Sequence, residues 1–107
     1  MLNQKWVDIM PEEVENWLRN PSRDVQFIDV RELAEYREGH IKGVKLIPLS
    51  QLEVRYDEID RKKETVVICR SGGRSRQACE FLSSYGYRKL YNMSGGMLAW
   101  QSETVID

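Results

Sequence analysis

The residues most able to do chemistry form a short loop that begins with a cysteine, Cys69. The loop continues through two arginines, two glycines and two serines, namely Arg70, Ser71, Gly72, Gly73, Arg74 and Ser75. Positive charge and backbone amides both stabilise a thiolate, which is the nucleophilic form of cysteine. Glycines permit the tight turns in which successive amides point at one anion. The loop therefore predicts an acidic, reactive Cys69 surrounded by anion-binding groups.

The elements on either side of this loop should place it at one edge of a sheet. Val25–Val30 and Thr65–Cys69 are rich in β-branched residues, which is typical of strands buried on both faces of a parallel sheet. Ser75–Tyr85 has apolar residues at helical spacing and is followed by Gly86, a helix stop signal. Ligand sites gather at the carboxyl ends of parallel strands, where Cys69 would lie.

Predicted strands and helices also alternate along the rest of the chain. Pro11–Arg19 predicts a helix, because it opens with proline and two glutamates and has an apolar stripe. We expect further strands at Val44–Ile47 and Lys89–Tyr91, and further helices at Glu32–Arg37, Leu49–Tyr56 and Met97–Trp100. This alternation predicts an α/β fold with right-handed crossovers. No linker or repeat divides the chain, so we expect one domain over residues 1–107.

Composition excludes several classes of protein. With 41% hydrophobic and 31% charged residues, the chain is typical of a globular protein. Its formal net charge of -1 gives no overall positive potential that would attract nucleic acid. No apolar run approaches the roughly 18 residues of a membrane span. Residues 1–10 lack a secretion signal, so we expect a cytoplasmic protein. The two cysteines are too few for a disulfide framework.

Several motifs together give the chain a resemblance to a known family. They are the loop at residues 69–75, the segments Asp29-Val30-Arg31, Glu35-Tyr36, Gly39-His40-Ile41-Lys42-Gly43 and Pro48, and the closing Gly95-Gly96-Met97-Leu98-Ala99-Trp100. Between about residues 27 and 100 the chain resembles the rhodanese family of sulfurtransferases, although Val44 stands where the family commonly has a small residue. The resemblance implies a doubly wound parallel sheet of five strands with helices on both faces.

The same resemblance implies a mechanism. Cys69 would attack a sulfane sulfur, become a persulfide and pass that sulfur to a nucleophile, with no metal or organic cofactor. Backbone amides from Ser71 to Ser75 would hold the outer sulfur. Arg70 and Arg74 resemble the thiosulfate-using members more than those that prefer mercaptopyruvate. The expected partners are a small donor such as thiosulfate and a thiol or cyanide acceptor, which could be a protein thiol; neither nucleic acid nor membrane is expected.

Two other functions fit parts of this pattern. Cysteine-dependent phosphatases also use a cysteine-headed loop and an arginine, but they have one residue more between the two than the four that separate Cys69 from Arg74. A non-catalytic rhodanese-like module would bind a partner, yet such modules often lack the cysteine.

Four residues outside the loop also have possible chemical roles. His40 could be a base for Cys69, but the resemblance favours a structural histidine. Asp29 and Arg31 are expected to form an ion pair that fixes loops. Cys79 is expected to be buried beside Ala78 and Leu82, with a resolving thiol as the alternative. One histidine and two cysteines make a structural zinc site improbable.

Overall fold

A parallel five-stranded sheet forms the centre of the computed structural model, which describes residues 5–106. Its strands are β1 (Val7–Ile9), β2 (Val25–Asp29), β3 (Lys45–Leu46), β4 (Glu64–Ile68) and β5 (Leu90–Met93), in the spatial order β1-β5-β4-β2-β3. The helices are α1 (Pro11–Leu18), α2 (Leu33–Glu38), α3 (Leu49–Arg55), α4 (Gly73–Ser84) and α5 (Gly96–Ala99), and a 3-10 turn, Tyr56–Glu58, follows α3. All neighbouring strands pair in parallel, which confirms the predicted sheet.

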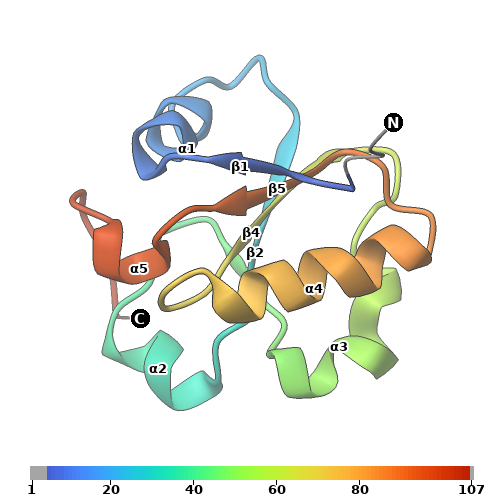
Figure 1. The fold of residues 1–107 in the computed structure, drawn as a ribbon. Helices are drawn as coiled ribbons and strands as arrows, with labels where there is room; N and C mark the ends of the chain where they lie inside the picture. Colours follow the sequence, from blue (N-terminus) through green and yellow to red (C-terminus); the bar gives the residue numbers. More distant parts are fainter. Residues whose placement is uncertain (1–4, 107) are drawn as a thin grey trace.

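Apolar side chains cover both faces of the sheet because successive strand residues point to opposite sides. Val66 of β4 belongs to a core cluster with Val14 of α1, whereas the next residue, Val67, packs in a second cluster with Leu82 of α4. Fully burying one such side chain contributes roughly 1.5 to 3 kcal/mol. Figure 1 shows α1 on one side of the sheet and α3 and α4 on the other. The predicted doubly wound arrangement is therefore confirmed.

The predicted elements are all present, with ends that differ by one or two residues. Strand and helix ends depend on pairing and caps that a pattern does not encode. The start of α4 differs by two residues, since the helix begins at Gly73 and not at Ser75, because Gly72 adopts the left-handed conformation with φ 108° and caps the helix. Tyr85, the last residue of the predicted helix, lies just after α4 and is 42% exposed.

One strand was not predicted. Val7–Ile9 forms the edge strand β1, and its residues pair with Tyr91, Asn92 and Met93 of β5. Only Ile9 is buried in it, so the segment lacks the continuous apolar run that identifies the central strands. Within residues 5–106, no helix is both long and apolar enough to cross a membrane.

Candidate active site

Cys69 directly follows the central strand β4 and is 1% exposed. The backbone N–H of Gly72 donates a hydrogen bond of 3.0 Å to its Sγ atom, and the Ser75 Oγ atom lies 3.3 Å from the same sulfur. This contact exists because the chain turns at Gly72 and enters α4 at once, so that the first turn of the helix faces back toward the strand end. The sulfur is therefore enclosed by the loop that it heads.

The surroundings of Cys69 favour its thiolate. Burial, the largest single effect, would by itself raise the pKa of the thiol. The hydrogen bonds from the Ser75 hydroxyl and from the backbone amides of Ser75, Gly72 and Ser71 together outweigh burial, and the pKa of Cys69 lies below its usual value. This direction agrees with the acidity expected from the sequence.

A second segment supports the loop from the C-terminal side. The backbone N–H groups of Met97 and Leu98 donate to the carbonyls of Cys69 and Arg70, at 2.8 and 2.9 Å. Gly96 makes this approach possible, since its φ is +58° and a Cβ there would stand 2.4 Å from the Cys69 carbonyl oxygen. The closing Gly95-Gly96 motif thus holds the backbone of the reactive loop.

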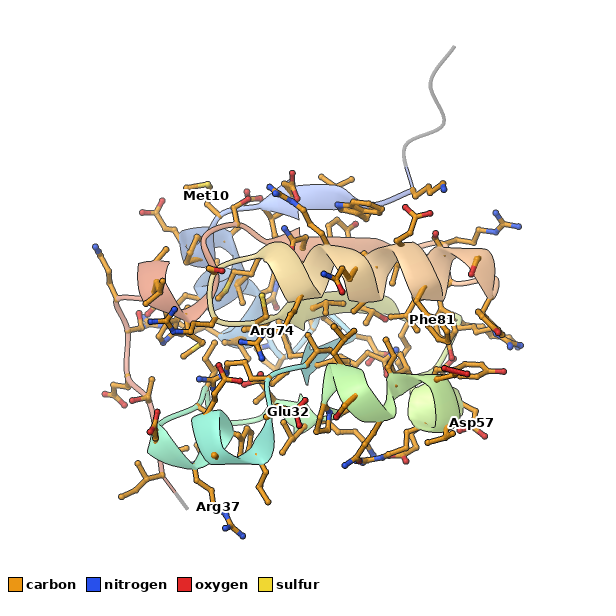
Figure 2. The ribbon with its side chains drawn as sticks, turned by 60° about the horizontal axis from the view of Figure 1, so that its bottom comes forward. Met10, Glu32, Arg37, Asp57, Arg74 and Phe81 are labelled. Carbon is orange, nitrogen blue, oxygen red and sulfur yellow. The ribbon has the colours of Figure 1, made fainter. Side chains whose placement is uncertain are left out.

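The two arginines of the loop have different surroundings. Arg74 is tied to Glu35 of α2 by two hydrogen bonds of 2.7 Å, and Figure 2 shows Arg74 between α4 and α2. This pairing is the main reason that the pKa of Glu35 is lowered to about 2. The pKa of Arg74 is raised, first by Glu35 and to a smaller extent by the Cys69 thiolate. Glu35 lies in a motif noted in the sequence, but its pairing with Arg74 was not predicted.

Arg70, Ser71 and Gly73 form the exposed rim of the loop. Among residues 5–106, no hydrogen-bonding or ion-pair partner is found for the Arg70 side chain. Gly72 and Ser75, by contrast, are buried beneath the rim. The Arg70 guanidinium is therefore available to bind an anion that approaches the loop from solvent.

Two polar residues behind Ser75 were missed by the sequence analysis. The Ser75 hydroxyl lies within hydrogen-bonding reach of the Gly72 carbonyl, at 3.0 Å, and of Asn92 Oδ1. Asn92 in turn donates through Nδ2 to Asp8 Oδ1 at 2.9 Å. No local motif reveals this arrangement, because it depends on the pairing of β1 with β5.

The contacts of three residues outside the loop agree with the structural roles predicted for His40, Asp29 and Arg31. The His40 ring stacks on Tyr36 with centroids 3.6 Å apart, and its Nδ1 contacts the Tyr36 carbonyl oxygen at 2.9 Å. Asp29 and Arg31 form a buried ion pair of 2.8 Å, and Arg31 also donates to the carbonyl of Gly39. These contacts connect the end of β2 to the segment after α2.

Cys79 is completely buried on the α4 face that packs against the sheet, as predicted. Burial raises the pKa of its thiol to about 12. Across residues 5–106, no group of three or more His, Cys, Asp and Glu side chains could hold a metal ion.

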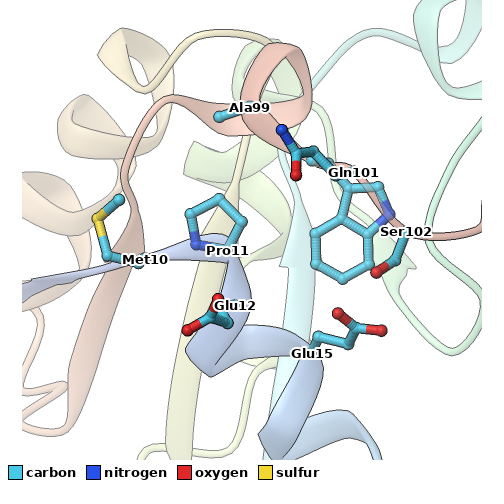
Figure 3. Close-up of a pocket in the computed structure, with 8 residues that line it drawn as sticks. Met10, Pro11, Glu12, Glu15, Ala99, Gln101 and Ser102 are labelled. Carbon is cyan, nitrogen blue, oxygen red and sulfur yellow. The ribbon is translucent and has the colours of Figure 1, made fainter.

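Two surface pockets lie away from Cys69. One has a volume of about 450 Å³ and lies between the start of α1 and the end of α5 (Figure 3). It is lined by Met10, Pro11, Glu12, Glu15, Ala99, Trp100, Gln101 and Ser102. A neighbouring pocket of about 460 Å³ continues along α1 and shares Glu15 and Trp100. Neither pocket contains a residue of the loop at 69–75.

Comparisons with known proteins agree with this geometry. Residues 10–103 match the family model of the rhodanese-like domain. A sulfurtransferase of Allochromatium vinosum is 38% identical over 79 residues, which are 74% of either chain, and the thiosulfate sulfurtransferase GlpE of Coxiella burnetii is 27% identical over 83% of either chain. The crystal structure of a rhodanese-like domain protein from Staphylococcus aureus has a TM-score of 0.86 and 31% identity, and the match covers 94% of this chain and 98% of that one. The chain therefore belongs to the rhodanese-like domain family.

Proposed function

We propose that this protein is a sulfurtransferase that carries sulfur as a persulfide on Cys69. The observation that supports this most is the environment of the Cys69 sulfur, which lies beneath a turn whose Gly72 amide points at it from 3.0 Å. Amides and a hydroxyl in this position stabilise an anionic sulfur without any metal. The lowered pKa of the Cys69 thiol gives the same support.

The proposed reaction has two displacements. In the first, the Cys69 thiolate attacks the outer, sulfane sulfur of a donor such as thiosulfate. A new S–S bond forms to Cys69, the S–S bond of the donor breaks, and sulfite leaves with its electron pair. In the second, a thiolate or cyanide attacks the outer sulfur of the persulfide. The Cys69 S–S bond then breaks, the acceptor carries the sulfur away, and the Cys69 thiolate is restored.

The loop residues have separate roles in this proposal. Cys69 is the catalytic residue, and the backbone of Ser71, Gly72, Gly73, Arg74 and Ser75 surrounds the outer sulfur. Arg70 attracts an anionic donor, because its side chain is exposed at the rim. Arg74 acts mainly on the shape of the loop, since both of its terminal nitrogens bind Glu35.

Thiosulfate is the donor that we propose first. It is a small dianion, which suits a loop with an uncommitted cation at its rim, and a family member from Coxiella burnetii is named a thiosulfate sulfurtransferase. The proposed acceptor is a thiol, on a small molecule or on a protein, or cyanide.

The geometry is less suited to a phosphatase. Only four residues separate Cys69 from Arg74, and the Arg74 guanidinium is already bound in parallel to a carboxylate. A phosphate bound by two hydrogen bonds would need that same edge of the guanidinium. A purely partner-binding module would gain nothing from a thiol made acidic by three amides and a hydroxyl.

The proposal is tested by mass spectrometry of the intact protein. Incubation with thiosulfate should add the mass of one sulfur atom, and cyanide should remove it. Cys69→Ser should gain nothing, whereas Cys79→Ala, the matched control, should gain and lose sulfur as the wild type does. Sulfur uptake by Cys69→Ser would disprove the role of Cys69, and turnover of an aryl phosphate that Cys69→Ser abolishes would favour a phosphatase.

A further inference from the structure

A line of hydrogen bonds connects the Cys69 sulfur to a carboxylate on the edge strand of the sheet. The Ser75 Oγ atom lies 3.3 Å from Sγ and contacts Asn92 Oδ1, and Asn92 Nδ2 donates to Asp8 Oδ1 at 2.9 Å. Asp8 and Asn92 are opposite each other in the pairing of β1 with β5. Ser75 and Asn92 are both completely buried.

The orientation of the Asn92 amide follows from the residue behind it. A carboxylate only accepts hydrogen bonds, so Asp8 requires the NH₂ group of Asn92 on its side. The Asn92 carbonyl oxygen must then face Ser75, and it needs the Ser75 hydroxyl as its donor. A hydroxyl has one proton, so Ser75 can donate to only one of the three acceptors around it, which are Asn92 Oδ1, the Gly72 carbonyl and the Cys69 sulfur.

This limit separates the two protonation states of Cys69. While Ser75 donates to Asn92, its oxygen can accept the proton of the Cys69 thiol, which favours the neutral thiol. When Cys69 ionises and the Ser75 hydroxyl turns its proton to the sulfur, the buried carbonyl of Asn92 loses the hydrogen bond from Ser75. A buried acceptor without a donor is unfavourable, so the arrangement opposes ionisation.

We propose that Asp8 is a positioning residue for Cys69, which holds the Asn92 amide in the orientation that draws the Ser75 proton away from the sulfur. Asp8 thereby limits the acidity that the loop amides give to Cys69. The inference goes beyond sulfur transfer, because it concerns the thiol itself and can be measured without any donor.

Other charged and titratable groups face the ends of this line. Arg76 of α4 lies 3.8 Å from Asp8 Oδ2, and both side chains of this pair are about half exposed, at 55% and 47%. Arg74 and Cys79, also on α4, interact electrostatically with Cys69. Removal of the Asp8 charge would therefore act on Cys69 directly as well as through the amide, and the experiment has to separate the two effects.

The test is a titration of Cys69 in Asp8→Asn. An asparagine at this position can donate to Asn92, so the Asn92 amide can invert, donate to Ser75 and release the Ser75 proton for the sulfur. The Cys69 midpoint should fall by about one pKa unit. Thiolate ultraviolet absorbance, measured as the difference from the matching Cys69→Ser protein, reports the midpoint, and iodoacetamide labelling of the Cys69 peptide provides a second measurement.

A double-mutant cycle separates the effect of this line of hydrogen bonds, here called the relay, from the direct electrostatic effect of the Asp8 charge on Cys69. In Ser75→Ala the relay is broken, so adding Asp8→Asn should leave the midpoint where Ser75→Ala alone puts it. Asp8→Glu, which keeps the carboxylate, should titrate close to wild type. All titrations are run at high salt, which screens a direct effect of the half-exposed Asp8 charge.

The outcomes are distinct. An unchanged or raised midpoint in Asp8→Asn would overturn the proposal, as would a fall that persists in the Ser75→Ala background, or one that Asp8→Glu reproduces in full. Thermal unfolding checks that each variant is folded. Failure of thiosulfate to transfer sulfur would refute the proposed function and leave this result intact.

Discussion

Arg74 and Glu35 are joined by two parallel hydrogen bonds, each of 2.7 Å, which connect the first turn of α4 to the first turn of α2. Glu35 also accepts the backbone N–H of Glu32 and so completes the cap of its own helix. One carboxylate therefore fixes both a helix start and a loop side chain. The two arginines of the loop therefore differ: Arg74 binds Glu35, whereas Arg70 is exposed to solvent.

Glu35→Gln should lower the free energy of unfolding at neutral pH by about 1 kcal/mol, because the charged pair is partly exposed and screened by solvent. The folded-state pKa of Glu35, about 2, lies below its usual value of 4.5. The contribution of the pair is therefore present above pH 4.5 and declines as the pH falls toward 2. Urea unfolding of both proteins at a series of pH values measures this.

The matched control is Glu38→Gln, a change of the same kind at the last residue of α2. Glu38 is exposed, and its substitution should change stability by less than about 0.5 kcal/mol. An equal effect of both substitutions, or one that does not depend on pH between 2 and 4.5, would contradict a special role for Glu35.

Arg70→Ala should lower kcat/KM for thiosulfate by about tenfold, the equivalent of one hydrogen bond to a charged group. The reason is the exposure of Arg70 at the rim, where it can meet a dianion. Arg88→Ala, at an exposed position before β5, is the control and should leave the kinetics unchanged. Steady-state assays with cyanide as acceptor measure the constants, and equal values for Arg70→Ala and wild type would mean that the backbone alone binds the donor.

Cys79 should not react in the native protein. Both thiols are buried, but the pKa of Cys79 is about 12 whereas that of Cys69 is lowered. Iodoacetamide at mildly alkaline pH should therefore modify Cys69 alone, and both cysteines only in denaturant. Cys79→Ala should cost about 1 kcal/mol of stability and keep sulfur uptake. Detection of a Cys69–Cys79 disulfide after turnover would instead assign Cys79 the role of a resolving thiol.

Gly96→Ala should destabilise the protein by at least about 2 kcal/mol more than Gly43→Ala. Both glycines have positive φ, +58° and +94°, so both substitutions introduce backbone strain. Only at Gly96 would the new Cβ meet backbone, at 2.4 Å from the Cys69 carbonyl oxygen, whereas nothing lies within 4 Å of a Cβ at Gly43. Chemical denaturation measures the free energy of unfolding of both variants. An equal loss of stability in the two would show that the loop backbone shifts to accommodate the added methyl group.

The sequence predicted the parts of the site that are local. Cys69 follows a buried strand and precedes a helix, and the glycines at 72 and 73 allow the sharp turn between them, so the contact of amides with sulfur follows from a few neighbouring residues. The buried strands were equally visible, because their apolar runs are continuous on both faces.

Long-range partners could not be predicted in the same way. Glu35 is 39 positions from Arg74, and Asp8 is 84 positions from Asn92. Such pairs depend on strand order and on the edge strand β1, which at three residues is too short to show a clear pattern. For the same reason the pairing of Arg74 with Glu35 could not be predicted, because that carboxylate comes from a distant helix.

The hydrogen bonds from Met97 and Leu98 to the carbonyls of Cys69 and Arg70 also have a consequence for biosynthesis. The residues that hold the loop lie more than a whole strand and helix further along the chain than Cys69 itself. Until that stretch has been synthesised, the carbonyls of Cys69 and Arg70 lack these two donors. The loop that Cys69 heads can therefore receive this backbone support only after residues 97 and 98 have been added to the chain.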